Sequence, residues 1–179
     1  MNRRLRDLTL VALFPAMMAA TAGIYIPLGA LPPVTLQTLF VLLSGLVLGA
    51  SLGALSMSIY VLLGVIGLPV FAGFNGGLGV VIGQNGGFLI SFIVVSYFVG
   101  FVKNRKIINN DFWHLIVVLA IGSVLVYMIG TSYLAFVTDS SYWLILAGMY
   151  VFFPGDLLKI LVATYVYVRI RPHITYERS

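Results

Sequence analysis

The sequence predicts an all-α integral membrane protein with six transmembrane helices and both termini in the cytoplasm. Of its 179 residues, 61% are apolar and only 8% are charged, and the mean hydropathy is +1.10. Soluble domains are roughly 45–50% apolar and 25% charged. A bilayer core about 30 Å thick needs about 20 apolar residues per helix, so the length allows about six crossings. We therefore expect residues 1–179 to form a single transmembrane domain.

Five hydrophobic stretches supply the crossings, at Leu8–Ile26, Leu36–Leu68, Phe88–Val102, Phe112–Tyr133 and Trp143–Ile170. The second stretch would form about 50 Å of continuous helix, which is too long for one crossing. The segment GASLG, from Gly49 to Gly53, is its natural breaking point because glycine favours turns. We expect two short spans joined by a tight turn, which brings the total to six.

The first stretch has an alternative interpretation as a cleavable signal peptide, because RRLR precedes its apolar run and the small residues ATAG follow. It also carries small residues at Ala12, Ala16 and Ala20, a spacing that allows another helix to approach closely. This face is predicted either to pack within the protein or to dock another membrane protein, with Ala12 and Ala16 in the cytoplasmic half.

The basic residues predict the orientation of the chain in the membrane. They cluster before the first span, after the fourth and after the sixth, at Arg3, Arg4 and Arg6, at Lys103, Arg105 and Lys106, and at Arg169, Arg171 and Arg178. With six crossings all three clusters fall on one side, which the positive-inside rule makes cytoplasmic. The orientation of the chain in the membrane therefore explains the net charge of +5, and we expect no nucleic-acid partner.

The last stretch is also long for one crossing, and Pro154 lies inside it. Proline suits the first helical position, where its missing N–H has no intrahelical partner. We therefore expect the sixth span to run from Pro154 to Ile170, preceded by a short helix over residues 141–152 at the outer membrane surface. Asp156 then lies in the first turn, where a carboxylate interacts favourably with the helix dipole.

Asp156 and Lys159 are the strongest indication of a function. Their i, i+3 spacing places them on one helix face, and charges within membrane spans are costly enough to suggest a functional site. The alternatives are a pair that neutralises itself and an Asp156 that only caps its helix. We favour a polar ligand. On the same outer side, Thr35 and Gln37 open the second span and are predicted to line the pocket, although Thr35 could equally cap that helix.

The glycine-rich segment GFNGGLGVVIGQNGG, residues 73–87, lies on the outer side between spans three and four. Asn-Gly pairs favour tight turns, and glycine lets the backbone approach a ligand closely. A flexible connector is the alternative, but Phe74, Leu78 and residues 80–82 would be poorly soluble in a free linker. We predict a folded lid over the membrane surface.

The sequence lacks the motifs of several classes of enzyme and metal site. The chain has no cysteine, no G-x-x-x-x-G-K-[ST] and no H-E-x-x-H, and His114 and His173 stand alone. Proton-relay transporters usually place more than one carboxylate within their spans, and Asp156 is the only candidate. We expect a protein that is not an enzyme and has no metal or cofactor. Its ligand should be mostly apolar with a few hydrogen-bonding groups and at most one negative charge.

The segment from Pro32 to Phe92, together with FFPGDLLKI at residues 152–160, closely resembles the BioY family, the biotin-binding S components of energy-coupling factor (ECF) transporters. The most specific elements are TLQTL, GLPVFAGFNGGLG and PGDLLK. One departure is GQNGG, where the family more often has Gly-Pro-Thr-Gly-Gly, so that Gln84 and Asn85 stand at a turn that differs from the family's.

The resemblance implies a multi-pass cell-membrane protein that captures biotin on the outer side with high affinity. Its partners would be a transmembrane coupling subunit, two cytoplasmic ATPase subunits and membrane lipid. Ala12 and Ala16 match an alanine motif that contacts the coupling subunit. The candidate ligand contacts are Asp156, Lys159, Asn75, Asn85, Gln37, Thr35 and Gln84.

Biotin also suits the physical reading of the site. Its ureido ring offers two N–H donors and one carbonyl acceptor, so Asp156 can accept from the ring while Lys159 donates to its oxygen or pairs with the valerate carboxylate. The alternatives are a self-sufficient facilitator or secondary transporter for biotin or a similar vitamin, and a membrane scaffold with a structural ion pair.

Overall fold

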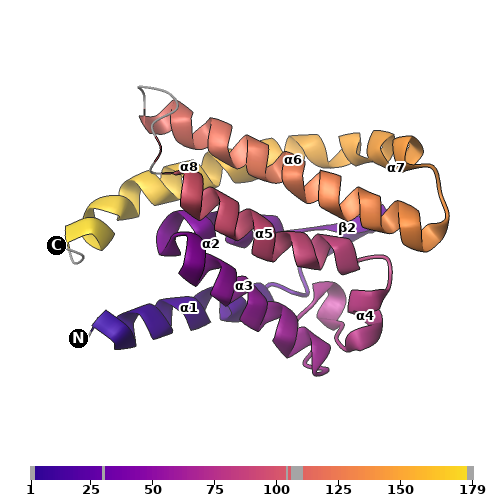
Figure 1. Ribbon diagram of the computed structural model, residues 1–179, viewed down its shortest axis with the longest axis horizontal. Helices are drawn as coiled ribbons and strands as arrows, with labels where there is room; N and C mark the ends of the chain where they lie inside the picture. The colour runs from indigo at the N-terminus through magenta and orange to yellow at the C-terminus, as the bar shows by residue number, and fades with distance from the viewer. Residues whose placement is uncertain (1–2, 30, 104, 106–110, 177–179) are drawn as a thin grey trace.

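The protein is a bundle made mostly of helices (Figure 1), seen in a computed structural model that describes residues 3–29, 31–103, 105 and 111–176. Lys106 and Arg178, two members of the predicted basic clusters, lie outside the described residues. Both ends of the chain lie at the same end of the bundle (Figure 1). The longer helices are α1 (Arg3–Ala20), α2 (Gln37–Leu48), α3 (Ala50–Val65), α5 (Gly86–Val102), α6 (Asp111–Thr138) and α8 (Phe153–Tyr176).

Helix α2 forms the centre of the bundle. Every residue from Phe40 to Leu48 is buried, and α2 packs against α1, α3, α5 and α8. The predicted break in the second hydrophobic stretch is confirmed, because α2 ends at Leu48 and α3 begins at Ala50. Gly49 makes the link with φ of 86°, a backbone conformation that glycine adopts without steric cost.

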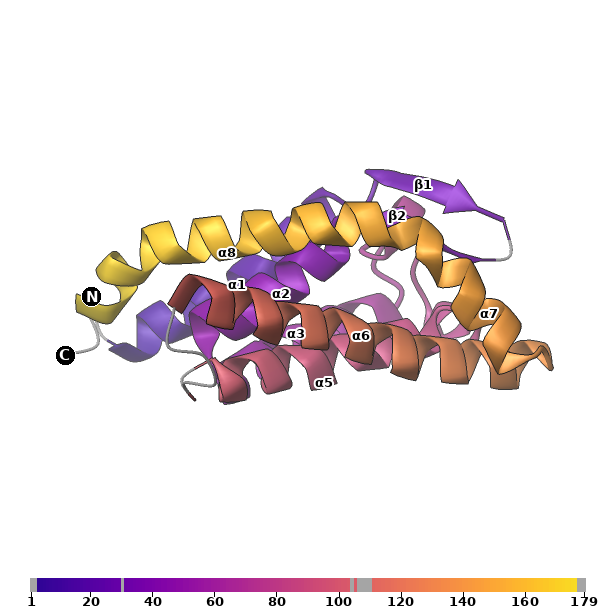
Figure 2. The same cartoon turned by 90° about the horizontal axis from the view of Figure 1, so that it is seen from above.

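The prediction of an all-α fold was wrong between the first two spans. Helix α1 ends at Ala20 instead of continuing to Ile26, and an antiparallel hairpin follows, formed by β1 (Tyr25–Leu28) and β2 (Leu31–Thr35). Figure 2 shows the hairpin at the end of the bundle opposite the termini. Proline does not suit a helix interior but is tolerated in edge strands, and this segment contains Pro27, Pro32 and Pro33.

The glycine-rich segment is folded, as predicted, and is not an open connector. It contains a 3₁₀ turn η1 (Ala72–Phe74) and a short helix α4 (Leu78–Ile82), and α5 begins at Gly86. Two backbone hydrogen bonds of 2.7 Å tie it to the bundle, from Gly73 N–H to the carbonyl of Ala22 and from Gly77 N–H to the carbonyl of Gly64. The segment is therefore held against both the α1–β1 junction and the end of α3.

The prediction of a helix start at Pro154 was wrong by one residue, whereas the short helix predicted over residues 141–152 is present as α7 (Tyr142–Gly148) and η2 (Met149–Phe152). Helix α7 passes through the 3₁₀ turn η2 directly into α8, which runs beyond the predicted end at Ile170. Figure 2 shows the chain bending between α7 and α8. Pro154 is accommodated because an N–H in the first turn of an α-helix has no intrahelical acceptor.

Among the residues that the structure describes, two helical units are long and apolar enough to cross a membrane by length and composition, α6 and the continuous unit from Tyr142 to Pro172. Helices α2, α3 and α5 are apolar but shorter, with 12, 16 and 17 residues. The number of crossings therefore stays a prediction.

Lys103 stabilises the end of the bundle that carries the termini. Its ammonium group donates a hydrogen bond to the carbonyl of Leu46, in the last turn of α2, and lies 5.6 Å from the centre of the Tyr167 ring on α8. His114 Nε2 of α6 lies 3.2 Å from the Lys103 carbonyl oxygen. A cation at the carboxyl end of a helix compensates the partial negative charge of its last carbonyls.

Pro15 interrupts the hydrogen bonding of α1, and α3 compensates for it. Proline has no N–H, so the carbonyl four residues earlier, that of Val11, loses its usual helical donor. Ser56 Oγ of α3 donates a 2.7 Å hydrogen bond to this carbonyl, and Ser56 is fully buried. A serine on a neighbouring helix is one of the ways in which membrane helices satisfy a carbonyl freed by proline.

Ser56→Ala should therefore lower the free energy of unfolding by about 1–3 kcal/mol, because the buried Val11 carbonyl would lose this donor. The measurement is thermal melting of the purified protein in detergent. Ser58→Ala is the matched control on the same helix, since Ser58 Oγ donates to the carbonyl of Ala54 four residues earlier, which already accepts a helical bond. Equal melting temperatures for the two variants would contradict the role of Ser56.

Candidate functional site

A cavity of about 500 Å³ lies at the end of the bundle opposite the termini. It is enclosed by the hairpin, the first turn of α2, residues 71–92, the middle of α6 and the start of α8. Most of the lining side chains are apolar, among them Leu28, Leu31, Phe71, Val80, Phe88, Leu89, Phe92 and Phe152. The polar lining residues are Thr35, Gln37, Thr38, Asn75, Gln84, Asn85, Asp156 and Lys159, with Tyr25 and Tyr127.

Asp156 and Lys159 form a buried ion pair in the cavity wall. Lys159 Nζ lies 3.1 Å from Asp156 Oδ1, and the two residues are 8% and 9% exposed. The pair sits in the first two turns of α8, so Asp156 also faces the positive end of that helix dipole. Burying two charges is costly unless hydrogen bonds satisfy them, and Lys159 Nζ gains a second partner in Thr38 Oγ1 at 2.9 Å.

Thr38 belongs to the site but was not predicted from the sequence. It is the second residue of α2 and directly follows Gln37. No local pattern pairs it with Lys159, because the two residues are 121 positions apart in the chain.

Thr35 lines the cavity and bonds to the first residue of α2, whereas the N-cap position itself is Leu36. Its hydroxyl lines the cavity and accepts a 3.3 Å hydrogen bond from the backbone N–H of Gln37, the first residue of α2. The same hydroxyl lies 3.3 Å from Gln37 Oε1, to which it donates. Gln37 is 7% exposed, and its Nε2 donates to Tyr60 OH at 2.6 Å. The side chain of Gln37 is therefore held at both ends of its amide.

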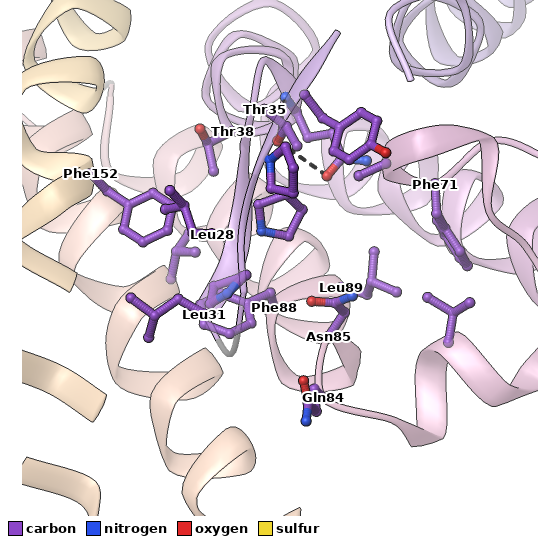
Figure 3. A pocket seen from close by; sticks show the side chains of 18 of the residues that line it. Leu28, Leu31, Thr35, Thr38, Phe71, Gln84, Asn85, Phe88, Leu89 and Phe152 are labelled. Atoms are coloured by element: carbon purple, nitrogen blue, oxygen red, sulfur yellow. Dashed lines mark hydrogen bonds between the residues drawn. The ribbon is translucent and has the colours of Figure 1, made fainter. Parts of the chain in front are cut away.

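Asn75 and the turn at Gln84 and Asn85 form the glycine-rich side of the cavity. Asn75 Nδ2 donates to the carbonyl of Ala72 at 2.7 Å, which closes the small loop against itself. Phe74 in this loop has a φ of 57°, an uncommon conformation for a bulky residue that tends to occur near functional sites. Figure 3 shows Gln84 and Asn85 on the side of the cavity opposite Thr35 and Thr38.

All the predicted ligand contacts line this cavity, and their binding of a ligand stays a prediction. Ala12 and Ala16 are exposed on α1, whereas Val11, Phe14 and Met18 of the same helix are buried. The small face of α1 thus points away from the bundle. Among the described residues, no group of three or more His, Cys, Asp and Glu side chains could hold a metal ion.

The sequence model of the BioY family matches residues 1–176. The chain belongs to the BioY family. The biotin transporter BioY of Thermotoga maritima is 38% identical to it over 167 residues, which cover 93% of this chain and 96% of the relative. The probable biotin transporter BioY of Pyrococcus horikoshii is 35% identical over 166 residues, with the same coverage.

A crystal structure of the S-component for biotin from an ECF-type ABC transporter has the same fold as this BioY-family chain. The TM-score is 0.87 at 31% identity, and the match covers 96% of this chain and 95% of the other. Membership of the BioY family makes the chain a multi-pass protein of the cell membrane and a transport protein, not an enzyme.

Proposed function

We propose that this BioY-family chain is a membrane-embedded subunit that captures biotin on the outer side with high affinity, for uptake by an ATP-driven ECF transporter. The observation that carries the proposal is the cluster of Asp156, Lys159 and Thr38, buried in a largely apolar cavity of a chain whose fold matches a biotin S-component. The relatives described as biotin transporters supply the identity of the ligand.

The cavity has the chemistry that biotin requires. Asp156 accepts from the ureido N–H groups, Lys159 and Gln37 provide donors, and the apolar walls receive the thiophane ring and the methylenes of the valerate chain. The volume of about 500 Å³ lies within the usual range of about 300–1,000 Å³ for small-molecule sites. The glycine-rich side of the cavity offers further polar contacts to the ligand, from Asn75, Gln84 and Asn85.

We infer that residues 1–179 form one transmembrane substrate-binding domain with six crossings and both termini cytoplasmic. Arg4, Lys103 and Arg171 lie in segments at the end of the bundle with the termini, which the positive-inside rule assigns to the cytoplasm. The cavity at the opposite end then opens to the outside.

The proposed partners are a transmembrane coupling subunit and two cytoplasmic ATPase subunits. The support comes from the S-component fold and from the exposed Ala12 and Ala16, whose small side chains allow a helix of the coupling subunit to approach α1 closely.

Titration of the purified full chain with biotin, followed by calorimetry in detergent, tests the function. We expect saturable binding of one biotin per chain. Octanoate, which has a carboxylate and an apolar chain but no ureido ring, should not compete. Absence of saturable heat from biotin would reject the proposal.

Liposome uptake separates the proposal from the facilitator alternative. Vesicles containing this chain alone should bind biotin without accumulating it, and ATP-dependent uptake should require the coupling subunit and the ATPases. Uptake by the chain alone would favour the facilitator.

A further inference from the structure

Tyr60 is a fully buried tyrosine of α3 whose hydroxyl connects two sides of the cavity, although Tyr60 does not itself line it. The hydroxyl is 2.6 Å from Gln37 Nε2, at the start of α2, and 2.9 Å from the carbonyl oxygen of Val70, just before the loop that carries Asn75. Tyr60 is 0% exposed. Water therefore does not substitute for either partner.

The direction of these hydrogen bonds is determined by their chemistry. The carbonyl of Val70 can only accept, so the single hydroxyl proton of Tyr60 must be donated to it. The Tyr60 oxygen then accepts, which requires the N–H₂ side of the Gln37 amide to face Tyr60. The Oε1 of Gln37 is consequently turned toward Thr35, whose hydroxyl donates to it. One N–H and one lone pair of the amide remain for a ligand.

The ring of Tyr60 also holds the loop from Val70 to Asn75. Phe71 packs edge-on against it, with ring centres 5.5 Å apart at 75°, and the Phe71 N–H donates to the carbonyl of Asn75 at 2.9 Å. Gly64 leaves the space for the Phe71 ring, because a Cβ there would lie 1.9 Å from Phe71 Cζ. Tyr60 thus contacts the loop through both its ring and its hydroxyl.

We propose that Tyr60 is a positioning residue of the ligand site, which sets the orientation of the Gln37 amide and couples it to the position of the loop that carries Asn75. This inference rests on the proposed binding of biotin. It predicts that Tyr60 influences affinity through Gln37, without touching the ligand, and that the loop loosens when the hydroxyl is removed.

The test compares wild-type chain, Tyr60→Phe, Gln37→Ala and the double variant by biotin calorimetry. Tyr60→Phe keeps the ring against Phe71 and removes the hydroxyl. We expect each single variant to weaken biotin binding at least tenfold. The double variant should lose little beyond Gln37→Ala alone, because residues that act as one unit are not additive. Hydrogen exchange of the amides from 71 to 75 in the ligand-free protein should become faster in Tyr60→Phe.

Ser56→Ala is the matched control, since it also removes a buried hydroxyl of α3 that donates to a backbone carbonyl. It should lower the melting temperature while biotin affinity and exchange at residues 71–75 stay as in the wild type. If Tyr60→Phe does not fold, Gln37→Met tests the same link from its other side, with the same tenfold loss and faster exchange expected.

The outcomes separate the two proposals. A wild-type chain that does not bind biotin would overturn the proposed function and this inference with it. If the wild type binds biotin and Tyr60→Phe binds it with an affinity within twofold of the wild type, the role of Tyr60 alone is overturned. If Tyr60→Phe is unfolded, the same criterion applies to Gln37→Met. Additive losses in the double variant would show that Tyr60 does not act through Gln37 and would also overturn it.

Discussion

Lys159→Ala is expected to weaken biotin binding at least tenfold, which corresponds to about 1.4 kcal/mol. The substitution leaves the carboxylate of Asp156 buried without its ion-pair partner and removes a cation from the cavity wall. Removing one member of a buried pair is more costly than its net contribution suggests, because the remaining charge is left uncompensated. Asp156→Asn should have an effect of the same order, since it removes the acceptor for the ureido N–H groups.

Leu158→Ala is the matched control for both substitutions. Leu158 lies beside Lys159 on α8 but is 63% exposed and does not line the cavity. Calorimetry should give wild-type affinity for this variant. If Lys159→Ala and Asp156→Asn also bind biotin with unchanged affinity while remaining folded, the assignment of the pair to the ligand site is refuted.

Ala16→Trp is expected to abolish assembly with the coupling subunit and the ATPases while biotin binding stays intact. Ala16 is exposed on α1, whereas the residues that pack into the bundle, such as Phe14 and Met18, point the other way. An indole at this position therefore fills the space into which a partner helix would approach without disturbing the core. Ala12→Trp should act in the same way.

A pull-down of the ATPase module from membranes that contain all subunits measures assembly. Leu161→Trp is the control, because Leu161 is 43% exposed but belongs to α8 and not to α1. It should recover the module as the wild type does. Recovery of the module by Ala16→Trp would exclude this face of α1 as the docking surface.

The candidate site illustrates how far local patterns reach. Asp156 and Lys159 could be paired in advance because their spacing is one helical turn, so any helix through PGDLLK brings them together. Thr38 and Tyr60 could not be assigned in the same way. Thr38 meets Lys159 across 121 residues, and Tyr60 meets Gln37 across 23, and both contacts depend on how α2, α3 and α8 pack.

The hairpin is a part of the fold that local hydropathy predicted wrongly. Ile24, Tyr25 and Ile26 are apolar and continue the hydrophobic stretch of α1, so hydropathy extended the first span over them. The prolines that follow prevent a helix, and the strands form because Tyr25 and Thr35 can pair across a turn. The mean hydropathy of a sequence window does not reveal this pairing, because the pairing depends on two separate segments, β1 and β2.

Composition, glycine positions and one-turn spacings are properties of short segments, and they were sufficient to predict a membrane protein, a break within Gly49–Gly53 and the pair of Asp156 and Lys159. The cavity, in contrast, could not be predicted from any short segment of the sequence. Its walls come from the hairpin, α2, the glycine-rich segment, α5, α6 and α8. The buried hydrogen bonds of Tyr60 join α3 to α2 and to Val70, which precedes the loop that carries Asn75. Such contacts exist only once packing has brought distant segments together and excluded water, so the folded bundle determines which polar groups a ligand can reach.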